Sequence, residues 1–120
     1  MNTVNYVYDQ YVELYNSGDT TAYLDGLIIC RARPSVNPDM ETNDFLQASY
    51  FFKFPGECNT TRDYPIEPGQ FIVVASDAFD HSSVVATSVD LSGADWEFFN
   101  PYAGDIDYPA DNVSNIAVSY

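Results

Sequence analysis

The sequence predicts an all-β fold, an antiparallel β-sandwich formed by one domain. Apolar and polar residues alternate with a period of two almost everywhere, which is typical of half-buried strands. Clusters of Gly, Pro and Asn separate these segments at intervals of roughly 8–15 residues, a spacing typical of sandwiches. No segment favours a helix longer than about two turns.

The first half of the chain contains three segments that we expect to be extended. Residues 4–15 carry the first alternating pattern, and the cluster NSGD at residues 16–19 then forms a turn. Residues 23–32 form a second extended segment, in which Gly26 indicates a bulge or kink. An aromatic-rich strand follows at residues 48–54.

A type II turn and a strongly apolar strand are expected next. Residues 67–70 (EPGQ) fit this turn, because Pro presets φ at its second position and Gly supplies a positive φ at its third. Residues 71–75 (FIVVA) form the most apolar strand, which we expect to be buried on both faces. Ser92 is expected to cap one helical turn before the aromatic segment 96–102.

The C-terminal residues indicate that the chain belongs to a longer protein. After an acidic loop at residues 104–112, Ile116, Val118 and Tyr120 alternate as in a strand, and the sequence stops within this pattern. The length of 120 residues suits one domain. We therefore expect residues 1–120 to form a single domain cut from a longer chain.

The charge and composition exclude several classes of protein. Four Lys and Arg oppose eighteen Asp and Glu, so the formal net charge is −14. Because nucleic acids and anionic lipids are bound through basic residues, we expect no such partner. The aromatic content of 16% is too high for a disordered acidic tail. No apolar run approaches the roughly 18 residues of a membrane helix, so we expect no membrane span.

Two cysteines leave the redox compartment open. Cys30 and Cys58 are not in a CxxC pair, so a structural zinc site is not expected. A disulfide between them and two free thiols are both compatible with the sequence. Cys30 ends a β-branched run and is expected to be buried, whereas Cys58 lies in a polar loop.

Four segments in this order resemble the lamin-tail domain, an immunoglobulin-like β-sandwich. They are residues 11–16 (YVELYN), 23–26 (YLDG), 51–56 (FFKFPG) and 68–75 (PGQFIVVA). In this pattern Leu14, Val12 and Leu24 would face the core, Asn16 would close a turn and Gly26 would redirect the strand. The sequence departs from the family at Leu27, where a Trp is usual.

The rest of the chain is similar to an uncharacterised Bacteroides-type family in which a lamin-tail-like module is part of an outer-surface lipoprotein. The segment ADWEFF at residues 94–99 carries part of this similarity. The resemblance implies an extracytoplasmic location, either at the cell surface as an outer-membrane lipoprotein or in the periplasm. It implies no catalysis. Some lamin tails bind nucleic acid through basic surfaces, which this acidic chain lacks.

Catalytic patterns are weak in this sequence. The single histidine, His81, lies in a polar loop with several Ser and Asp residues, and no nucleophile elbow accompanies it. We therefore expect an exposed loop histidine and no enzyme activity.

Two acidic sets could hold Ca²⁺, which takes several carboxylate and carbonyl oxygens from flexible loops. Asp105 and Asp107 would point the same way, and Asp111 could return to complete an oxygen cage. The second set is Asn37, Asp39, Glu41 and Asn43. A solvated loop accounts equally well for both sets, so we expect no obligatory cofactor.

Aromatic side chains near the C-terminus suggest either a binding surface or core material. Trp96, Tyr102 and Tyr108 are interleaved with acids, as in sites where rings stack on sugars and carboxylates bind hydroxyls. The alternative is that these rings fill the core. We expect a non-enzymatic accessory module that contacts a protein partner, with carbohydrate binding, assisted by Ca²⁺, as the alternative.

Overall fold

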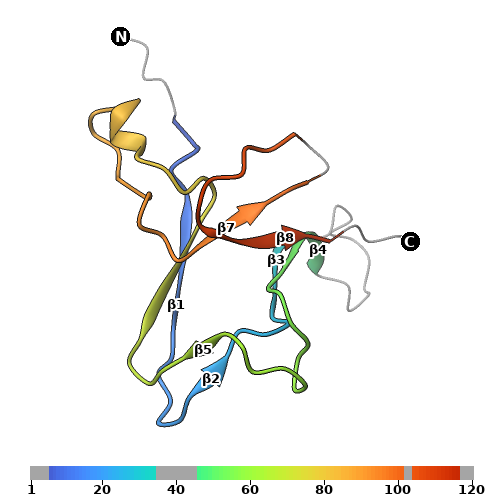
Figure 1. The fold of residues 1–120 in the computed structure, drawn as a ribbon. Helices are drawn as coiled ribbons and strands as arrows, with labels where there is room; N and C mark the ends of the chain where they lie inside the picture. Colours follow the sequence, from blue (N-terminus) through green and yellow to red (C-terminus); the bar gives the residue numbers. More distant parts are fainter. Residues whose placement is uncertain (1–5, 35–45, 102–103, 117–120) are drawn as a thin grey trace.

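The computed structural model describes residues 6–34, 46–101 and 104–116, which form an all-β structure (Figure 1). This confirms the predicted fold class at the level of secondary structure. The elements are β1 (Tyr11–Tyr15), β2 (Ala22–Tyr23), β3 (Ile28–Pro34), β4 (Leu46–Lys53), β5 (Pro65–Ile66), β6 (Phe71–Ala75), the 3₁₀ turn η1 (His81–Ser83), β7 (Trp96–Phe99) and β8 (Asp111–Asn115).

Six of the strands form one mixed sheet in the order β1-β6-β7-β8-β4-β3, which curls into about half of a barrel (Figure 1). β2 and β5 form a separate two-stranded sheet. The β1–β6, β3–β4 and β4–β8 pairs are antiparallel, whereas β6–β7 and β7–β8 are parallel. The prediction that all strands pair antiparallel is therefore wrong for two pairs.

Long crossover loops explain the parallel pairs. Two parallel strands cannot be joined by a tight hairpin and need a connection of roughly a dozen residues. Residues 76–95 connect β6 to β7 and include η1, and the segment after β7 returns to the start of β8. Period-two alternation shows that a segment is extended but carries no information on the direction of its neighbour, so the sequence did not reveal these crossovers.

The motifs that carry the lamin-tail resemblance meet in the structure. The Asn16 side chain accepts a hydrogen bond from the Gly18 N–H and donates to the backbone oxygens of Thr20 and Ile66. The Gly69 N–H, in turn, donates to the Asn16 carbonyl over 2.8 Å. Gly69 has φ +79°, as the predicted type II turn requires. Asn16 thus connects the end of β1 to the turn that precedes β6.

The main core lies between the curled sheet and the β2–β5 pair. Its buried members are Leu24, Phe54, Ile66, Ile72, Val74, Trp96 and Val113. The Trp96 ring makes edge-to-face contacts with Phe54 and Tyr64, at centroid distances of 5.0 and 5.2 Å. Leu24 and Leu14 contribute to this core as predicted, whereas Val12 and Phe71 are exposed. β6 is therefore not buried along its whole length.

Two local predictions are wrong. No helical turn starts at Ser92, whose N–H and Oγ instead donate to the Asp90 carboxylate. The described 3₁₀ turn lies at η1, where Asp80 accepts a hydrogen bond from the Ser82 N–H as the N-cap. Cys30 is exposed and not buried as expected; Cys58 is exposed as well, and the two thiols are not joined.

Among the described residues, no helix has the length and hydropathy to cross a bilayer.

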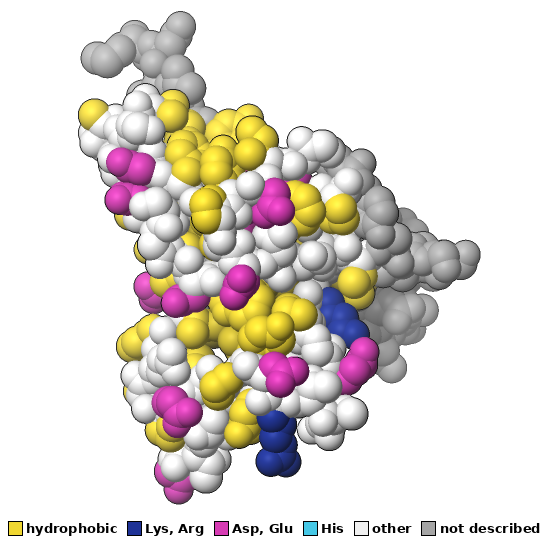
Figure 2. All heavy atoms as spheres, viewed as in Figure 1, with side chains coloured by type: hydrophobic (Ala, Val, Ile, Leu, Met, Phe, Trp, Pro, Cys, Tyr) yellow, Lys and Arg dark blue, Asp and Glu magenta, His cyan; other side chains and the backbone are white. Residues whose placement is uncertain are grey.

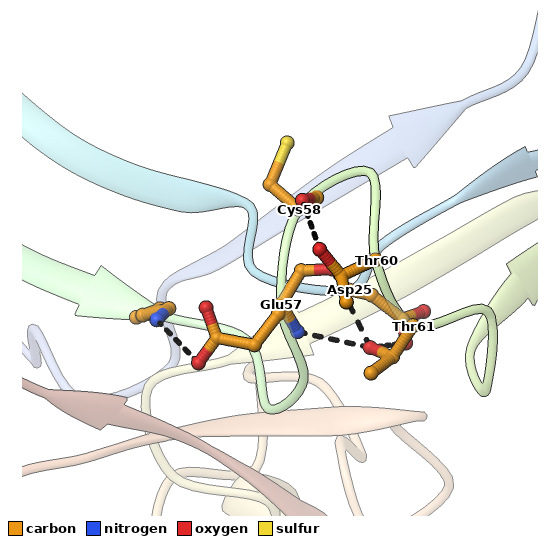
Figure 3. A network of polar contacts seen from close by, with 6 residues as sticks. Asp25, Glu57, Cys58, Thr60 and Thr61 are labelled. Atoms are coloured by element: carbon orange, nitrogen blue, oxygen red, sulfur yellow. Dashed lines mark hydrogen bonds and ion pairs between the residues drawn. The ribbon is translucent and has the colours of Figure 1, made fainter.

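Asp25 joins the β2–β3 turn to the loop that precedes β5 (Figure 3). Its buried carboxylate accepts hydrogen bonds from the Thr61 hydroxyl at 2.6 Å and from the Asp63 and Tyr64 N–H groups at 2.8 and 2.9 Å. Although burial acts to raise the pKa of Asp25, these donors lower it below its ordinary value. Lys53 and Glu57 form an ion pair of 3.9 Å beside this network.

Asp25→Asn should lower the melting temperature at about pH 7, because the amide nitrogen cannot accept a hydrogen bond from one of the three donors. A carboxyl group whose folded-state pKa is lowered stabilises the fold above its ordinary pKa, and this contribution is lost as the pH falls through the folded-state value. Thermal melts from about pH 7 to pH 2 should therefore show the difference from the parent shrinking. A difference independent of pH would contradict this role for the charge.

Gly26→Ala should destabilise the protein much more than Gly69→Ala. Both residues have positive φ, which costs a non-glycine residue about 1–2 kcal/mol. A Cβ on Gly69 would meet nothing within 4 Å, whereas a Cβ on Gly26 would lie 2.5 Å from the Cys58 backbone nitrogen. We expect Gly26→Ala to lower the free energy of unfolding by roughly 3 kcal/mol or more. If chemical denaturation gave the same loss of unfolding free energy for Gly26→Ala and Gly69→Ala, the Cys58 backbone would not be what restricts position 26 to glycine.

Candidate functional site

A pocket of about 410 Å³ lies at the end of the molecule that carries η1. The segment before β1, the crossover between β6 and β7 and the loop between β7 and β8 each contribute to its wall. The lining residues are Tyr6, Tyr8, Asp77, Phe79, Val84, Gly104, Asp105, Ile106 and Tyr108. We call this site the aromatic–acidic pocket.

The lining residues from these three segments include no Lys or Arg. Figure 2 shows hydrophobic and acidic side chains at the end that carries η1, with the dark-blue Lys and Arg side chains of this face towards the opposite end. The pocket therefore combines apolar walls with uncompensated negative charge.

His81 is fully buried beside the pocket, and the prediction of an exposed loop histidine is wrong. Its Nε2 atom lies 2.8 Å from the Asp77 carbonyl oxygen, so this nitrogen carries the proton and donates. Nδ1 then accepts a hydrogen bond from the Tyr6 hydroxyl, at 2.6 Å. The histidine is buried because it fastens the segment before β1 to the crossover, a contact between distant parts of the sequence.

Glu97 anchors both loops that line the pocket. Its carboxylate is fully buried and accepts hydrogen bonds from the Ala78 N–H at 2.8 Å and from the Tyr108 N–H at 3.2 Å. Burial raises the pKa of Glu97, the two backbone donors act to lower it, and Asp105 and Asp77 add to the rise. Since Ala78 lies between the lining residues Asp77 and Phe79, and Tyr108 itself lines the pocket, Glu97 fixes the separation of two walls.

The two carboxylates of the pocket have few hydrogen-bond donors. Asp105 accepts one hydrogen bond, from the Asn100 N–H at 3.1 Å. Within the described part of the chain, no hydrogen bond reaches the Asp77 carboxylate. Burial, followed by repulsion from Asp105, raises the pKa of Asp77, and the neighbouring His81 acts in the opposite direction. Both acids are thus available to a donor from outside the domain.

The aromatic walls are held by ring contacts. Phe79 and Tyr108 are stacked at a centroid distance of 5.1 Å with 26° between their planes. Tyr6 and Tyr8 are in an edge-to-face arrangement at 5.5 Å. Burial, then the charges of Asp77, Glu97 and Asp105, raise the pKa of Tyr108, so its hydroxyl stays protonated at neutral pH. The Tyr8 side chain, at 60% exposure, forms the accessible rim.

The structure separates Trp96 from Tyr108, two of the three aromatic residues that the sequence suggested for ligand contact. Tyr108 lies in the pocket, but Trp96 is only 6% exposed and packs in the core, so its ring faces are not open to a ligand. Tyr102 lies outside the described residues. For Trp96, the structure matches the alternative in which the ring fills the core.

The suggested calcium ligands do not converge in the described part of the chain. Asp105 lies in the pocket, Asp107 accepts a hydrogen bond from the Asn112 side-chain nitrogen, and Asp111 is exposed at the start of β8. Among the described residues, no three His, Cys, Asp or Glu side chains are grouped so that they could hold a metal ion. The second suggested set, Asn37, Asp39, Glu41 and Asn43, lies outside those residues.

Sequence reasoning did not select the other walls of the pocket, notably Tyr6, Tyr8, Asp77 and Phe79. The alternation of polar and apolar residues gave no signal here, because the Phe79 N–H donates to the Asp77 carbonyl oxygen over 3.0 Å in a tight turn, and the consecutive residues Asp105 and Ile106 both line the pocket. Nothing in the sequence indicates that these segments meet. Their meeting depends on the crossover loops.

Asp77→Asn should raise the melting temperature at about pH 7. A carboxyl group whose folded-state pKa is raised destabilises the fold as the pH rises from its ordinary pKa through the folded-state value. The Asn variant does not ionise and so does not lose this stability. Its higher melting temperature relative to the parent should therefore disappear at about pH 3, where Asp77 of the parent is protonated. Asp19→Asn removes the same charge from an exposed turn and is the control for both pH values. An equal gain in both variants would contradict a local effect.

Comparison with known proteins gives a partial match in sequence and a nearly complete match in fold. Residues 67–120 match the family model described as "Protein of unknown function (DUF4876)". No curated protein matches the chain. The chain is similar to the crystal structure of a DUF4876 family protein from Bacteroides thetaiotaomicron VPI-5482, with a TM-score of 0.70 and 24% sequence identity over 93% of this chain.

The chain spans only 31% of that solved protein. At this identity the match shows the fold, and it agrees with the predicted similarity to an uncharacterised Bacteroides-type family. The lamin-tail and lipoprotein parts of that expectation stay predictions. The chain is therefore similar to DUF4876 proteins in sequence over residues 67–120 and in fold over nearly its whole length.

Proposed function

We propose that the chain is a non-enzymatic binding module of a larger extracytoplasmic protein and that it contacts a protein partner through the aromatic–acidic pocket. The observation that carries this proposal is the pocket itself, which presents aromatic rings and two carboxylates to solvent. Val84 and Ile106, at 64% and 63% exposure, extend its apolar rim. Exposed apolar surface gathered around a cavity is typical of an interaction site.

The state of His81 supports a role without catalysis. It is the only histidine in the sequence, and both of its ring nitrogens are engaged in hydrogen bonds in a fully buried position. A general base must reach the proton that it removes, to within hydrogen-bonding distance. The imidazole acts here as a structural link between two segments.

The proposed location rests on the resemblance to surface proteins of the Bacteroides type. A lamin-tail-like sandwich in an outer-surface lipoprotein, or in a periplasmic protein, would present a binding module of this size. The similar solved protein is about three times longer than the stretch that this chain matches, which is consistent with a module in a larger assembly.

Carbohydrate is the second candidate ligand. The exposed Tyr8 ring and the carboxylates of Asp77 and Asp105 could contact a sugar face and its hydroxyls. A protein partner is favoured because Trp96 is in the core and the Phe79 and Tyr108 rings cover one another. This leaves Tyr8 as the one strongly exposed ring of the described pocket.

Site-specific photo-crosslinking in the full-length protein tests the proposal. A photoreactive phenylalanine analogue at position 8 should give a discrete protein adduct in the cells that make the protein. The matched control is position 15, since Tyr15 is also an exposed aromatic side chain, at 52%, but lies at the far end of β1.

Three outcomes are informative. A protein adduct from position 8 that is absent from position 15 supports the proposal. An adduct at position 8 that is removed by glycosidases favours the carbohydrate candidate instead. The same pattern of adducts from both positions, or no adduct from position 8, overturns the assignment of the pocket as the contact site.

A further inference from the structure

The chemistry of the pocket also specifies the group that it would hold. We infer that the aromatic–acidic pocket binds an organic cation, the guanidinium group of an arginine in a basic segment of the partner protein. This inference rests on the proposed function and adds the chemical class of the ligand. It depends on the charge of the pocket, the arrangement of its rings and the groups that hold them.

The charge of the pocket favours a cation. Asp77 and Asp105 face the pocket from two different loops, and no Lys or Arg lies among the lining residues. In the described chain no hydrogen bond reaches the Asp77 carboxylate, and Asp105 accepts one backbone N–H. The repulsion between them contributes to the raised pKa of Asp77, and a cation would relieve it. A guanidinium group has five N–H donors and can serve both carboxylates.

The aromatic walls of the pocket also favour a cation. A cation close to an aromatic face is attracted by the negative charge of the π system, and the planar guanidinium also stacks on rings. The exposed Tyr8 ring offers such a face at the rim of the pocket, and Tyr6, Phe79 and Tyr108 complete its aromatic lining. A metal ion would make no use of them, and two carboxylates are fewer than the six to eight oxygen ligands that Ca²⁺ takes.

The walls of the pocket are preorganised by contacts within the domain. The Tyr6 hydroxyl is held by buried His81, and the Phe79 ring lies 4.0 Å from the His81 ring between centroids. Tyr108 is held through its backbone by Glu97 and through its ring by Phe79. A ligand would therefore meet walls that are already ordered, which reduces the entropy lost on binding. The acidic field of the whole chain, at −14, would also speed the approach of a basic segment.

Titration calorimetry with a short peptide tests this assignment. The probe is a capped pentapeptide, acetyl-Gly-Gly-Arg-Gly-Gly-amide, and its control replaces arginine with citrulline, which has nearly the same shape but no charge. We expect the arginine peptide to bind and the citrulline peptide to bind at least about tenfold more weakly. Lysine in place of arginine should give intermediate affinity, since an ammonium lacks the planar fork.

Pocket variants locate the binding. Asp77→Asn and Asp105→Asn should each weaken binding of the arginine peptide about fivefold, and Tyr8→Leu about threefold. The matched controls are Asp19→Asn and Glu13→Gln, which remove exposed charges elsewhere, and Tyr15→Leu, which removes an exposed ring at the far end of β1. These controls should leave the affinity unchanged, and a thermal melt of every variant confirms that it is folded.

The contrary outcomes are distinct from failure of the proposed function. Equal weakening by pocket and control variants would mean general attraction to an acidic surface and would overturn the inference. Competition by Ca²⁺ alone at equal ionic strength, or binding of a neutral oligosaccharide at the same residues, would also overturn it. If position 8 crosslinks to a protein but the arginine peptide does not bind, the cation assignment fails while the proposed function stands.

Discussion

The buried carboxylate of Glu97 holds together the two crossover loops that the parallel strand pairs require. β7 lies between β6 and β8, and both neighbours run parallel to it, so the chain must cross over once before β7 and once after it. Glu97 lies within β7 and accepts one backbone N–H from each crossover, at Ala78 and Tyr108. The Ala78 N–H donates to its Oε2 atom and the Tyr108 N–H to its Oε1 atom, so the two oxygens of one side chain fix the path of both loops.

The pocket follows from this arrangement. Once the two crossovers are fixed to β7, Asp77 and Phe79 on one loop face Asp105 and Tyr108 on the other. His81 then attaches the segment before β1, through the Tyr6 hydroxyl, as a third wall. These two buried polar residues act beside a small apolar cluster, in which Tyr108 and Ala110 of the second crossover pack against buried Ala78 and Leu91 of the first. Buried, fully satisfied polar groups specify geometry more strictly than apolar contacts do, because an unsatisfied partner is costly.

Two aspartates illustrate how position decides the role of the same side chain. Asp25 is surrounded by three donors, which stabilise its charge and connect two loops. Asp77 is partly buried next to the carboxylate of Asp105, and in the described chain no hydrogen-bond donor reaches it. Its negative charge therefore destabilises the fold. Groups that weaken a fold and face a cavity are frequent at binding sites, where a ligand supplies the missing interaction.

The sequence by itself determined that the chain is rich in strands and where several strands and turns lie, because these features depend on neighbouring residues. Period-two alternation located β1, β3, β4 and β6, the glycine of EPGQ set its turn, and Asn16 closed its turn through its own side chain, whereas β8 begins inside the expected acidic loop. The tertiary structure alone decided strand direction, the burial of His81 and Trp96, and the meeting of Tyr6, Asp77 and Tyr108. These features join residues from about 15 to about 100 positions apart, and no local pattern encodes which distant partner a half-apolar side chain will contact. Of the suggested ligand residues, Tyr108 and Asp105 lie in the pocket because the β7–β8 crossover brings them there, and the same crossover leaves Asp111 on the surface.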